Sequence, residues 1–433
     1  MRVLRQRETG DEFTENILEN ALARARLSPA DRGLCQEMVY GVVRWQATLD
    51  WLIARKTNGR EQKAALQNLL RLGLYQIFWL DRIPPHAAVH ETVELAKYSG
   101  YASQSGFVNA VLRGFLREAE ATKALLADLK TQQPALGFSQ PEWLVERWRK
   151  NFGEEKTRRL LEWNNTPPKT FARVNPLKCG QAQPATLEAA AEDLVERWRE
   201  ENVEYDFFTR DWTGENLVFE LKAHPPLAAL GSFRDGWFYI QDPSTLLAVV
   251  KLAARTGETI LDLCAAPGGK TTFIAWQTRD QGRIMATDLS EERLKLIREN
   301  CQRLGISSVK IETVSDLMAG SPDLKFDRIL VDAPCSNTGV LRRRVDLRWR
   351  ISADEILRLR KTQLELLGFA AQKLQPRGVL VYSTCSLEPE ENAGVVQEFM
   401  AAHQNFKLES TRELLPFADE VDGAFVARLE KVD

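Results

Sequence analysis

The sequence predicts a multidomain protein in which a helical region and a small α/β region precede a doubly wound parallel α/β sheet. Three observations predict it. Residues 14 to about 130 carry apolar positions at helical spacing, and from residue 242 onward short apolar strands alternate with amphipathic helices. The chain of 433 residues is also too long for one ordinary core, so two or three domains are expected.

Composition favours a globular protein of a reducing compartment. Hydrophobic residues make up 44% and charged residues 27%, and no apolar run approaches the roughly 18–20 residues of a membrane helix. The first seven residues lack the apolar core of a signal peptide. Six cysteines and four histidines are scattered without metal-ligand spacing, so neither disulfides nor a metal is expected. We therefore expect a cytoplasmic protein that has no contact with membranes, and we take a monomer as the default.

The N-terminal domain, residues 1–135, is expected to be a helical bundle. Apolar side chains such as Leu34, Met38 and Val42 recur at helical spacing through Asp31–Ile53. Further helical stretches are expected at Gln62–Leu80, Ala87–Tyr98 and Phe107–Arg117. Arg44, Arg113 and Arg117 lie on these stripes, where they could contact an RNA helix.

The middle domain, residues 136–235, mixes helices with short strands. Thr166–Pro176 contains several prolines and is expected to be extended. Glu188–Glu201 has the pattern of a helix, and Gly236–Gln241 that of a strand entering the third domain, residues 236–433.

The third domain alternates strands with helices. Strands are expected at Thr259–Leu263, Arg283–Thr287, Val309–Val314, Asp327–Val331 and Gly378–Tyr382. Helices are expected near Lys270–Gln277, Glu291–Leu304 and Ser352–Leu374, the last beginning with a capping box. Two closing apolar segments, near Phe406–Leu408 and Gly423–Leu429, suggest antiparallel strands at one edge.

A glycine turn after the first of these strands has the form of a nucleotide-cofactor loop. Gly268 and Gly269 lie between a strand and a helix, where the backbone can approach a ligand closely. Asp288 ends the next strand, where a carboxylate can bind ribose hydroxyls, and Asp316 and Asp332 are expected to close the following two. These acids should gather at the carboxyl edge of the sheet.

Two other loop types fit less well. A phosphate-binding P-loop would continue into Gly269-Lys270-Thr271, but Cys264 stands where its first glycine belongs. A nicotinamide site needs Gly-x-Gly-x-x-Gly, which this sequence lacks.

Two cysteines directly follow apolar strands. Cys335 ends Ile329–Cys335, and Cys385 ends Val379–Cys385, so both thiols should lie at the edge that carries the glycine turn. A thiolate that adds to carbon 6 of cytosine activates carbon 5 toward an electrophilic methyl group. Either thiol meets this requirement, with Asp332 as a nearby acid. Cys35, Cys179 and Cys301 are expected to be inert core residues.

An arginine-rich run follows the first of these thiols. The run Leu341–Arg350 interleaves arginines with a tryptophan, which suits phosphate contacts and base stacking. We therefore predict RNA contacts at Arg342, Arg343, Arg344, Arg348 and Trp349. Because chemistry at carbon 5 requires an unstacked base, the RNA should be single-stranded or locally opened.

These motifs resemble those of the RNA cytosine-5 methyltransferases. Asp262–Thr271 resembles the first S-adenosylmethionine motif of that family. Asp332–Ser336 and Ser383–Ser386, with Glu388–Asn392 behind them, resemble its two cysteine motifs.

The N-terminal region is similar to another known domain, that of the antitermination factor NusB. Asp31–Arg44 and Phe107–Arg113 carry this similarity. The fusion as a whole resembles the bacterial 16S ribosomal RNA methyltransferase family called RsmB, Sun or Fmu. This resemblance implies a NusB-like RNA-binding domain, a small RRM-like domain and a Rossmann-like class I methyltransferase domain.

The resemblance also implies residue roles. Cys385 would be the nucleophile, Cys335 would assist product release, and Asp332 would hydrogen-bond the cytosine ring. The implied target is cytosine 967 of 16S rRNA, and the implied product of the cofactor is S-adenosylhomocysteine. S-adenosylmethionine would be held by Cys264, Ala265, Ala266, Pro267, Gly268, Gly269, Lys270, Asp288, Asp316 and Asp332.

Three residues depart from the family pattern. Asn337 stands where glycine or alanine is usual, Arg348 replaces a frequent lysine, and Ala424 replaces a bulkier residue. None of them removes a catalytic group.

Three alternatives to methylation of 16S rRNA remain open. They are the same chemistry on tRNA, a non-catalytic RNA-binding assembly factor, and a P-loop nucleotidase.

Overall fold

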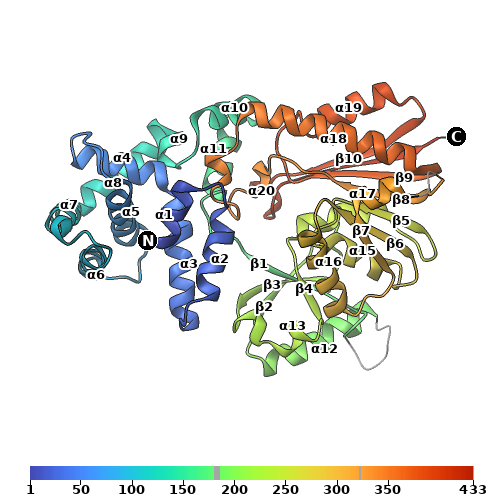
Figure 1. Ribbon diagram of the computed structural model, residues 1–433, viewed down its shortest axis with the longest axis horizontal. Helices are drawn as coiled ribbons and strands as arrows, with labels where there is room; N and C mark the ends of the chain where they lie inside the picture. Colours follow the sequence, from blue (N-terminus) through green and yellow to red (C-terminus); the bar gives the residue numbers. More distant parts are fainter. Residues whose placement is uncertain (180–185, 321–322, 433) are drawn as a thin grey trace. The chain divides into compact units, whose positions relative to one another are not determined.

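The computed structural model describes residues 1–179, 186–320 and 323–432 and divides into two compact units (Figure 1). The first unit comprises Met1–Pro167 and the short segment Leu341–Arg350. The second comprises Pro168–Val340 and Ile351–Asp433. Residues 136–167, assigned from sequence to the middle domain, therefore belong to the first unit.

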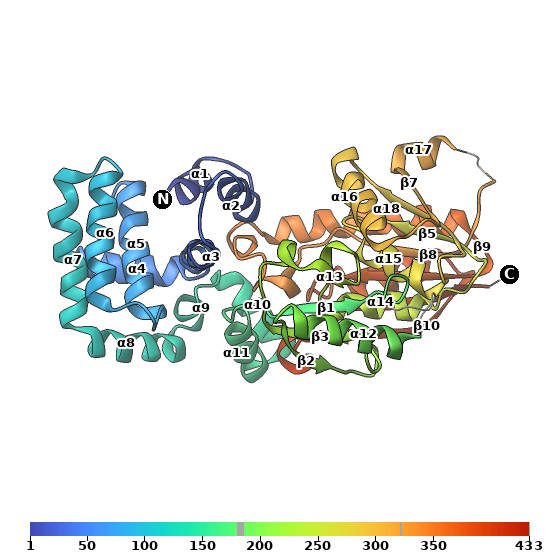
Figure 2. The same cartoon turned by 90° about the horizontal axis from the view of Figure 1, so that it is seen from below.

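The first unit is helical. Helices α5, α6 and α7 lie side by side in it (Figure 2), and buried leucines such as Leu69 and Leu112 fill its core. Its helices are α1 (Arg2–Thr9), α2 (Thr14–Ala23), α3 (Pro29–Arg44), α4 (Gln46–Lys56), α5 (Ala64–Trp79), α6 (Pro85–Tyr98), α7 (Ser105–Arg117), α8 (Ala119–Gln132), α9 (Pro134–Gly137), α10 (Glu142–Phe152) and α11 (Glu154–Trp163).

The helical stretch expected over Asp31–Ile53 is broken in the middle. Helix α3 ends at Arg44 and α4 begins at Gln46, because Trp45 leaves helical geometry at φ −102° and ψ 17°. The break lets the Trp45 ring pack against Trp79, with 5.1 Å between ring centroids. The apolar spacing continues through both helices, so periodicity alone does not reveal the break.

Two residues of the arginine-rich run, Arg342 and Arg348, are buried in the interior of the first unit. Arg348 is 0% exposed, and its guanidinium donates to the carbonyl oxygens of Arg44 (3.2 Å) and Asn164 (3.0 Å), among others. Arg342 is 1% exposed and stacks over Trp163, and Trp349 donates to the carbonyl of Val43. The predicted RNA contacts of Arg342 and Arg348 are therefore wrong, because both side chains are buried. Trp349 is half-buried, and its RNA contact stays a prediction.

Burial explains the difference. A run of arginines gives the same sequence pattern whether its side chains face water or buried backbone carbonyls. Here the C-terminal ends of α3 and α11 supply such carbonyls to Arg348. Burial lowers the pKa of Arg348 to about 9. Arg344 is the exposed member of the run, and Arg343 is half-buried.

Replacing Arg348 by alanine is expected to destabilise the first unit by roughly 3 kcal/mol, because several buried carbonyls lose a charged donor. Urea unfolding of the full chain, followed by tryptophan fluorescence, measures this loss. The exposed Arg344→Ala variant is the matched control and should change the midpoint little. Equal midpoints for the two variants would contradict the structural role of Arg348.

The second unit contains a small antiparallel sheet of order β2-β3-β1-β4. Helices α12 (Leu187–Glu200) and α13 (Gly231–Arg234) pack on it, and Trp198 of α12 packs edge to face against Phe219 and Phe238 in the core. Its strands are β1 (Thr170–Val174), β2 (Glu204–Phe208), β3 (Val218–Ala223) and β4 (Phe238–Ile240). The elements expected at 166–176, 188–201 and 236–241 correspond to β1, α12 and β4.

The second unit also contains a seven-stranded sheet of order β10-β11-β9-β8-β5-β6-β7. The five strands from β9 to β7 in this order are parallel, while β11 and β10 close one edge in antiparallel fashion. The strands are β5 (Thr259–Leu263), β6 (Arg283–Asp288), β7 (Val309–Thr313), β8 (Phe326–Asp332), β9 (Leu374–Thr384), β10 (Phe406–Leu414) and β11 (Ala424–Lys431). The doubly wound fold class expected from the sequence is thereby confirmed.

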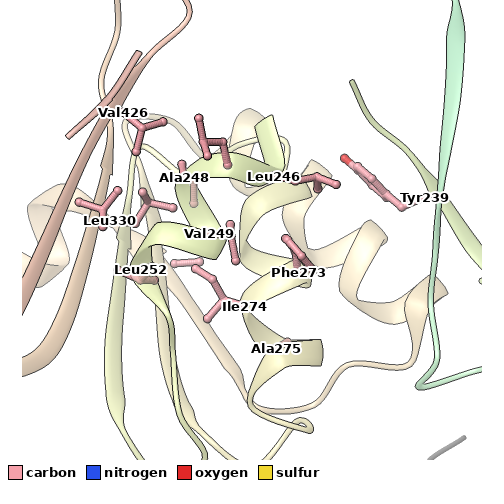
Figure 3. Close-up of a cluster of buried hydrophobic side chains, with 14 of the residues drawn as sticks. Tyr239, Leu246, Ala248, Val249, Leu252, Phe273, Ile274, Ala275, Leu330 and Val426 are labelled. Atoms are coloured by element: carbon pink, nitrogen blue, oxygen red, sulfur yellow. The ribbon is translucent and has the colours of Figure 1, made fainter. Parts of the chain in front are cut away.

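Helices cover both faces of this sheet. On one face α14 (Leu246–Leu252), α15 (Gly269–Gln277) and α16 (Glu291–Leu304) pack, and Val249, Ile274 and Leu330 meet in that core (Figure 3). On the other face lie α17 (Val314–Ala319), α18 (Ala353–Lys373) and α19 (Ala393–Ala402), and a short α20 (Pro416–Asp419) precedes β11. In the described part of the chain, no helix has the length and apolar character to span a membrane.

Candidate active site

Parallel neighbours β8 and β9 bring the two predicted thiols together. Asp332 pairs in register with Ser383, so the loops after both strands start at the same edge of the sheet. The Sγ atoms of Cys335 and Cys385 lie 3.4 Å apart. The expected meeting of these thiols is confirmed.

The two thiols have different surroundings. Cys335 is 7% exposed, and its hydrogen bond with Cys385 together with burial raises the pKa of Cys335 well above the usual range. Cys335 therefore keeps its proton at neutral pH. Cys385 is half-buried and is the more accessible of the two.

Asn337 contacts the Cys385 thiol directly. Its Nδ2 donates to the carbonyl oxygen of Cys335 at 2.6 Å, and its Oδ1 lies 3.0 Å from Cys385 Sγ. Because only the amide nitrogen can donate to a carbonyl, Oδ1 is the atom that faces the thiol. Asn337 has a φ of +59°, which asparagine tolerates.

Asp332 lies beside the thiol loops and is held by two donors. Lys270 Nζ is 2.6 Å from its Oδ2, and Ser383 Oγ donates to its Oδ1 at 2.7 Å. Burial disfavours the charged form of Lys270, but the Asp332 carboxylate outweighs it and raises the pKa of Lys270. Lys270, predicted from the loop motif, thus forms an ion pair with the acid of the first cysteine motif.

The glycine turn links β5 to α15 at the same edge. Cys264 and Gly268 have φ values of +66° and +100°, and the Ala265 N–H donates to Thr287 O at 2.8 Å. Asp288 is 1% exposed, and its carboxylate accepts from the Ala266 N–H and from Arg293 Nη1. The turn and Asp288 are therefore tied together across β5 and β6.

Burial makes three other thiols, those of Cys179, Cys264 and Cys301, poorly suited to nucleophilic chemistry. Burial, reinforced by nearby carboxylates such as Asp288, raises the pKa of Cys264 to about 12. Burial likewise raises the pKa values of Cys179 and Cys301 to about 12.

Asp316 lies elsewhere than expected. Strand β7 ends at Thr313, and Asp316 is in the first turn of α17, where it accepts from Thr313 in a capping box. The prediction that Asp316 closes the third strand is therefore wrong. Thr313 is the N-cap of α17, so the helix begins at Val314, two residues before Asp316.

Asp262, the residue before the last of β5, is fully buried. Thr271 Oγ1 donates to its Oδ2 at 2.6 Å, while Oδ1 has no hydrogen-bond partner among the described residues. Burial raises the pKa of Asp262 to about 7, although the Thr271 hydrogen bond opposes the rise.

This raised pKa predicts a pH dependence of stability. Between about pH 4 and 7 the folded state holds a proton on Asp262 that the unfolded state releases, so its contribution to stability falls as pH rises through this window. Asp262→Asn should therefore gain stability over wild type, by about 2–4 kcal/mol, between pH 4.5 and 8. Urea midpoints at both pH values measure this gain. The exposed Asp354→Asn should show no such trend, and a wild-type-like trend in Asp262→Asn would contradict the assignment.

Two buried charged residues near the site were not identified as functional from the sequence. Glu391 accepts hydrogen bonds from the serines that follow both cysteines, Ser336 and Ser386. The repeated Cys-Ser pair was the available signal. Arg173, on β1, donates to Gly269 O (2.9 Å) and to Thr272 Oγ1 (2.9 Å), and no local pattern marked it.

The arrangement combines an accessible thiol, a protonated thiol, a paired carboxylate and a glycine turn on one sheet edge. Such a site can add a thiolate to an electron-poor ring beside a bound nucleoside cofactor. Within residues 1–179, 186–320 and 323–432, no group of three or more His, Cys, Asp or Glu side chains is arranged to hold a metal ion.

Comparisons with protein-family models give three matches. A model described as 16S rRNA methyltransferase RsmB/F matches residues 249–430. The NusB family model matches residues 1–117, and a ferredoxin-like domain model of RsmF/B-like methyltransferases matches residues 140–204.

Similar proteins extend over nearly the whole chain. A protein from Bacillus subtilis, named probable ribosomal RNA small subunit methyltransferase B, is 33% identical over 98% of this chain and 96% of its own length. The Synechocystis protein of the same name is 35% identical over 99% and 98%.

Solved structures also resemble this chain. A methyltransferase homolog from Pyrococcus horikoshii is 30% identical, has a TM-score of 0.58, and covers 69% of this chain and 97% of its own. The crystal structure of PH0851 has a TM-score of 0.78 at 24% identity, covering 99% and 97%, and supports the fold alone.

Proposed function

The chain belongs to the RsmB family of small-subunit ribosomal RNA methyltransferases, and from that premise we propose that it methylates carbon 5 of a cytosine in 16S rRNA through a covalent Cys385 adduct. The observation that carries the proposal is the pair of thiols 3.4 Å apart beside Asp332. A single buried thiol would suit packing, whereas two thiols at one strand edge suit addition followed by elimination.

The environments of the two thiols support separate roles. Cys385, the accessible thiol, adds to carbon 6 of the cytosine and forms a sulfur–carbon bond that activates carbon 5. Cys335 keeps its proton, because its hydrogen bond to Cys385 and its burial raise the pKa of Cys335. In the elimination, solvent water takes the proton from carbon 5, the sulfur–carbon bond breaks and Cys385 leaves as a thiolate. The protonated Cys335, with its Sγ 3.4 Å away, is suited to assist this release by donating a hydrogen bond to the departing sulfur. Asp332, oriented by Lys270 and Ser383, is the group we assign to the ring nitrogen edge.

The residues present fit S-adenosylmethionine, which supplies the electrophilic methyl group when bound. Asp262 Oδ1 is buried and has no hydrogen-bond partner in the described part of the chain, and the Asp288 carboxylate, also buried, accepts from a backbone N–H of the glycine turn. We assign Cys264–Lys270 and Asp288 to hold the cofactor, together with Asp316, which stays exposed on α17.

Asp288→Ala is expected to weaken S-adenosylmethionine binding by about 10–100-fold, because the ribose hydroxyls lose a charged acceptor. Isothermal titration calorimetry of the wild type and the variant measures the change. Glu299→Ala, which removes an exposed carboxylate from the adjacent helix α16, is the control and should bind normally. Unchanged affinity in Asp288→Ala would remove this residue from the proposed cofactor site.

The first unit offers a basic groove to an RNA partner. It lies between α6 and α7, has a volume of about 530 Å³, and is lined by His86, Val89, His90, Val93, Asn109, Arg113, Leu116 and Arg117. Its arginines suit phosphate contacts. We therefore propose that this unit binds RNA, as expected from the sequence.

Labelled methyl transfer from S-adenosylmethionine tests the proposal, with protein-free 16S rRNA, 30S particles and bulk tRNA as separate substrates. We expect 5-methylcytosine in the 16S arm, and mapping of the label tests position 967. Transfer to tRNA alone would support the proposed methyl transfer to cytosine but contradict 16S rRNA as the substrate. Binding without transfer in every arm would favour a non-catalytic assembly factor.

A further inference from the structure

A buried carboxylate joins the two loops that carry the thiols. Glu391 Oε1 accepts from the Ser336 N–H (2.9 Å) and from Gln363 Nε2 (3.1 Å). Its Oε2 accepts from Ser386 Oγ at 2.5 Å and from Ser336 Oγ. Ser336 directly follows Cys335, and Ser386 directly follows Cys385.

We propose that Glu391 is a positioning residue that sets the separation of the two active-site thiols by holding the serine next to each of them. The inference rests on the proposed function, because it assigns those thiols to catalysis. Glu391, Ser386 and Gln363 are 0% exposed and Ser336 is 4% exposed, so water does not compete for these hydrogen bonds.

Further hydrogen bonds hold the loop backbones, and the Asn337 side chain also contacts the Cys385 thiol. The Gly339 N–H donates to Cys385 O, and the Leu387 N–H donates to Thr338 Oγ1, both at 2.9 Å. These bonds hold the loop backbones together, so the loops should remain folded when Glu391 is changed. The Glu391 side chain, in contrast, binds both Ser336 and Ser386, the residues that follow the two cysteines.

Glutamine is the conservative replacement. Burial raises the pKa of Glu391, and the hydrogen bonds from Ser336 and Ser386 oppose the rise. An uncharged side chain of the same length therefore suits this environment, and the hydroxyl groups of both serines can turn to accept from an amide. Alanine removes every side-chain contact.

The test compares Glu391→Ala, Glu391→Gln and the double variant Ser336→Ala/Ser386→Ala in the full chain. We expect Glu391→Ala to lower kcat for 16S rRNA methylation about 100-fold, because small misplacement of reacting groups is costly, while KM for S-adenosylmethionine changes less than about threefold. The serine double variant should reproduce this loss. Glu391→Gln should keep kcat within about tenfold of wild type.

Alkylation supplies a readout that needs neither RNA nor methyl donor. Iodoacetamide labelling of Cys335, followed by peptide mass spectrometry, should be about tenfold faster in Glu391→Ala, because the buried thiol is no longer held against its neighbour. Glu365→Ala, which removes an exposed carboxylate from α18, should match wild type.

Two results would overturn the inference. One is unchanged labelling of Cys335 in Glu391→Ala; the other is a kcat loss accompanied by an equal loss of cofactor affinity and of thermal stability. Faster labelling in Glu391→Ala, combined with no methyl transfer by wild type, would uphold the positioning role and reject the proposed function.

Discussion

Replacing Cys385 by alanine is expected to lower methyl transfer to 16S rRNA by about 10⁴-fold or more, because the proposed reaction then lacks its nucleophile. Cys335 is not expected to take its place, since its burial still disfavours the thiolate after the hydrogen bond to Cys385 is lost. Binding of S-adenosylmethionine should persist, because the glycine turn and Asp288 do not include Cys385. Labelled transfer and calorimetry measure the two properties separately.

The matched variant Cys335→Ala should accumulate a covalent complex with RNA, because Cys385 can still add to the base but its release is no longer assisted. The complex is visible as a slowly migrating band on a denaturing gel. Cys35→Ala, in the first unit, should behave as wild type. The reverse pattern, with adduct in Cys385→Ala and no turnover in Cys335→Ala, would make Cys335 the attacking thiol.

Elements bounded by local signals were predictable. Helix α16 has the bounds expected from sequence, because Ser290 caps its start and Gly305 ends it with a φ of +70°. Strand β5 likewise matches its expected range. The break at Trp45 was not predictable, because it depends on packing against Trp79, 34 residues further along the chain.

In the candidate site, too, some features were predictable from sequence and others were not. The meeting of Cys335 and Cys385 followed from two apolar strands lying parallel in one sheet, a relation that strand alternation encodes. The Glu391 contacts and the burial of Arg348 did not follow. Both depend on side chains reaching partners in distant segments, and the sequence shows charge without showing its surroundings.

Asp332→Asn is expected to lower kcat by about 10²–10³-fold, because an amide of the same size cannot pass a proton to the ring nitrogen, which gains negative charge when Cys385 adds to carbon 6. The change also leaves the buried Lys270 ammonium without its carboxylate at 2.6 Å, so thermal stability should fall as well. Steady-state methylation kinetics and thermal unfolding measure the two effects. A fall in stability alone would already show that the pair matters structurally, so the variant needs a partner that separates the effects.

The double variant Lys270→Met/Asp332→Asn provides that separation. Methionine removes the unpaired charge while keeping an apolar chain of similar length, so stability should recover toward wild type. If Asp332 acts on the substrate, kcat should stay low in the double variant despite this recovery. Recovery of kcat together with stability would instead show that Asp332 serves only to neutralise Lys270, and the assignment of Asp332 to the cytosine ring would be wrong.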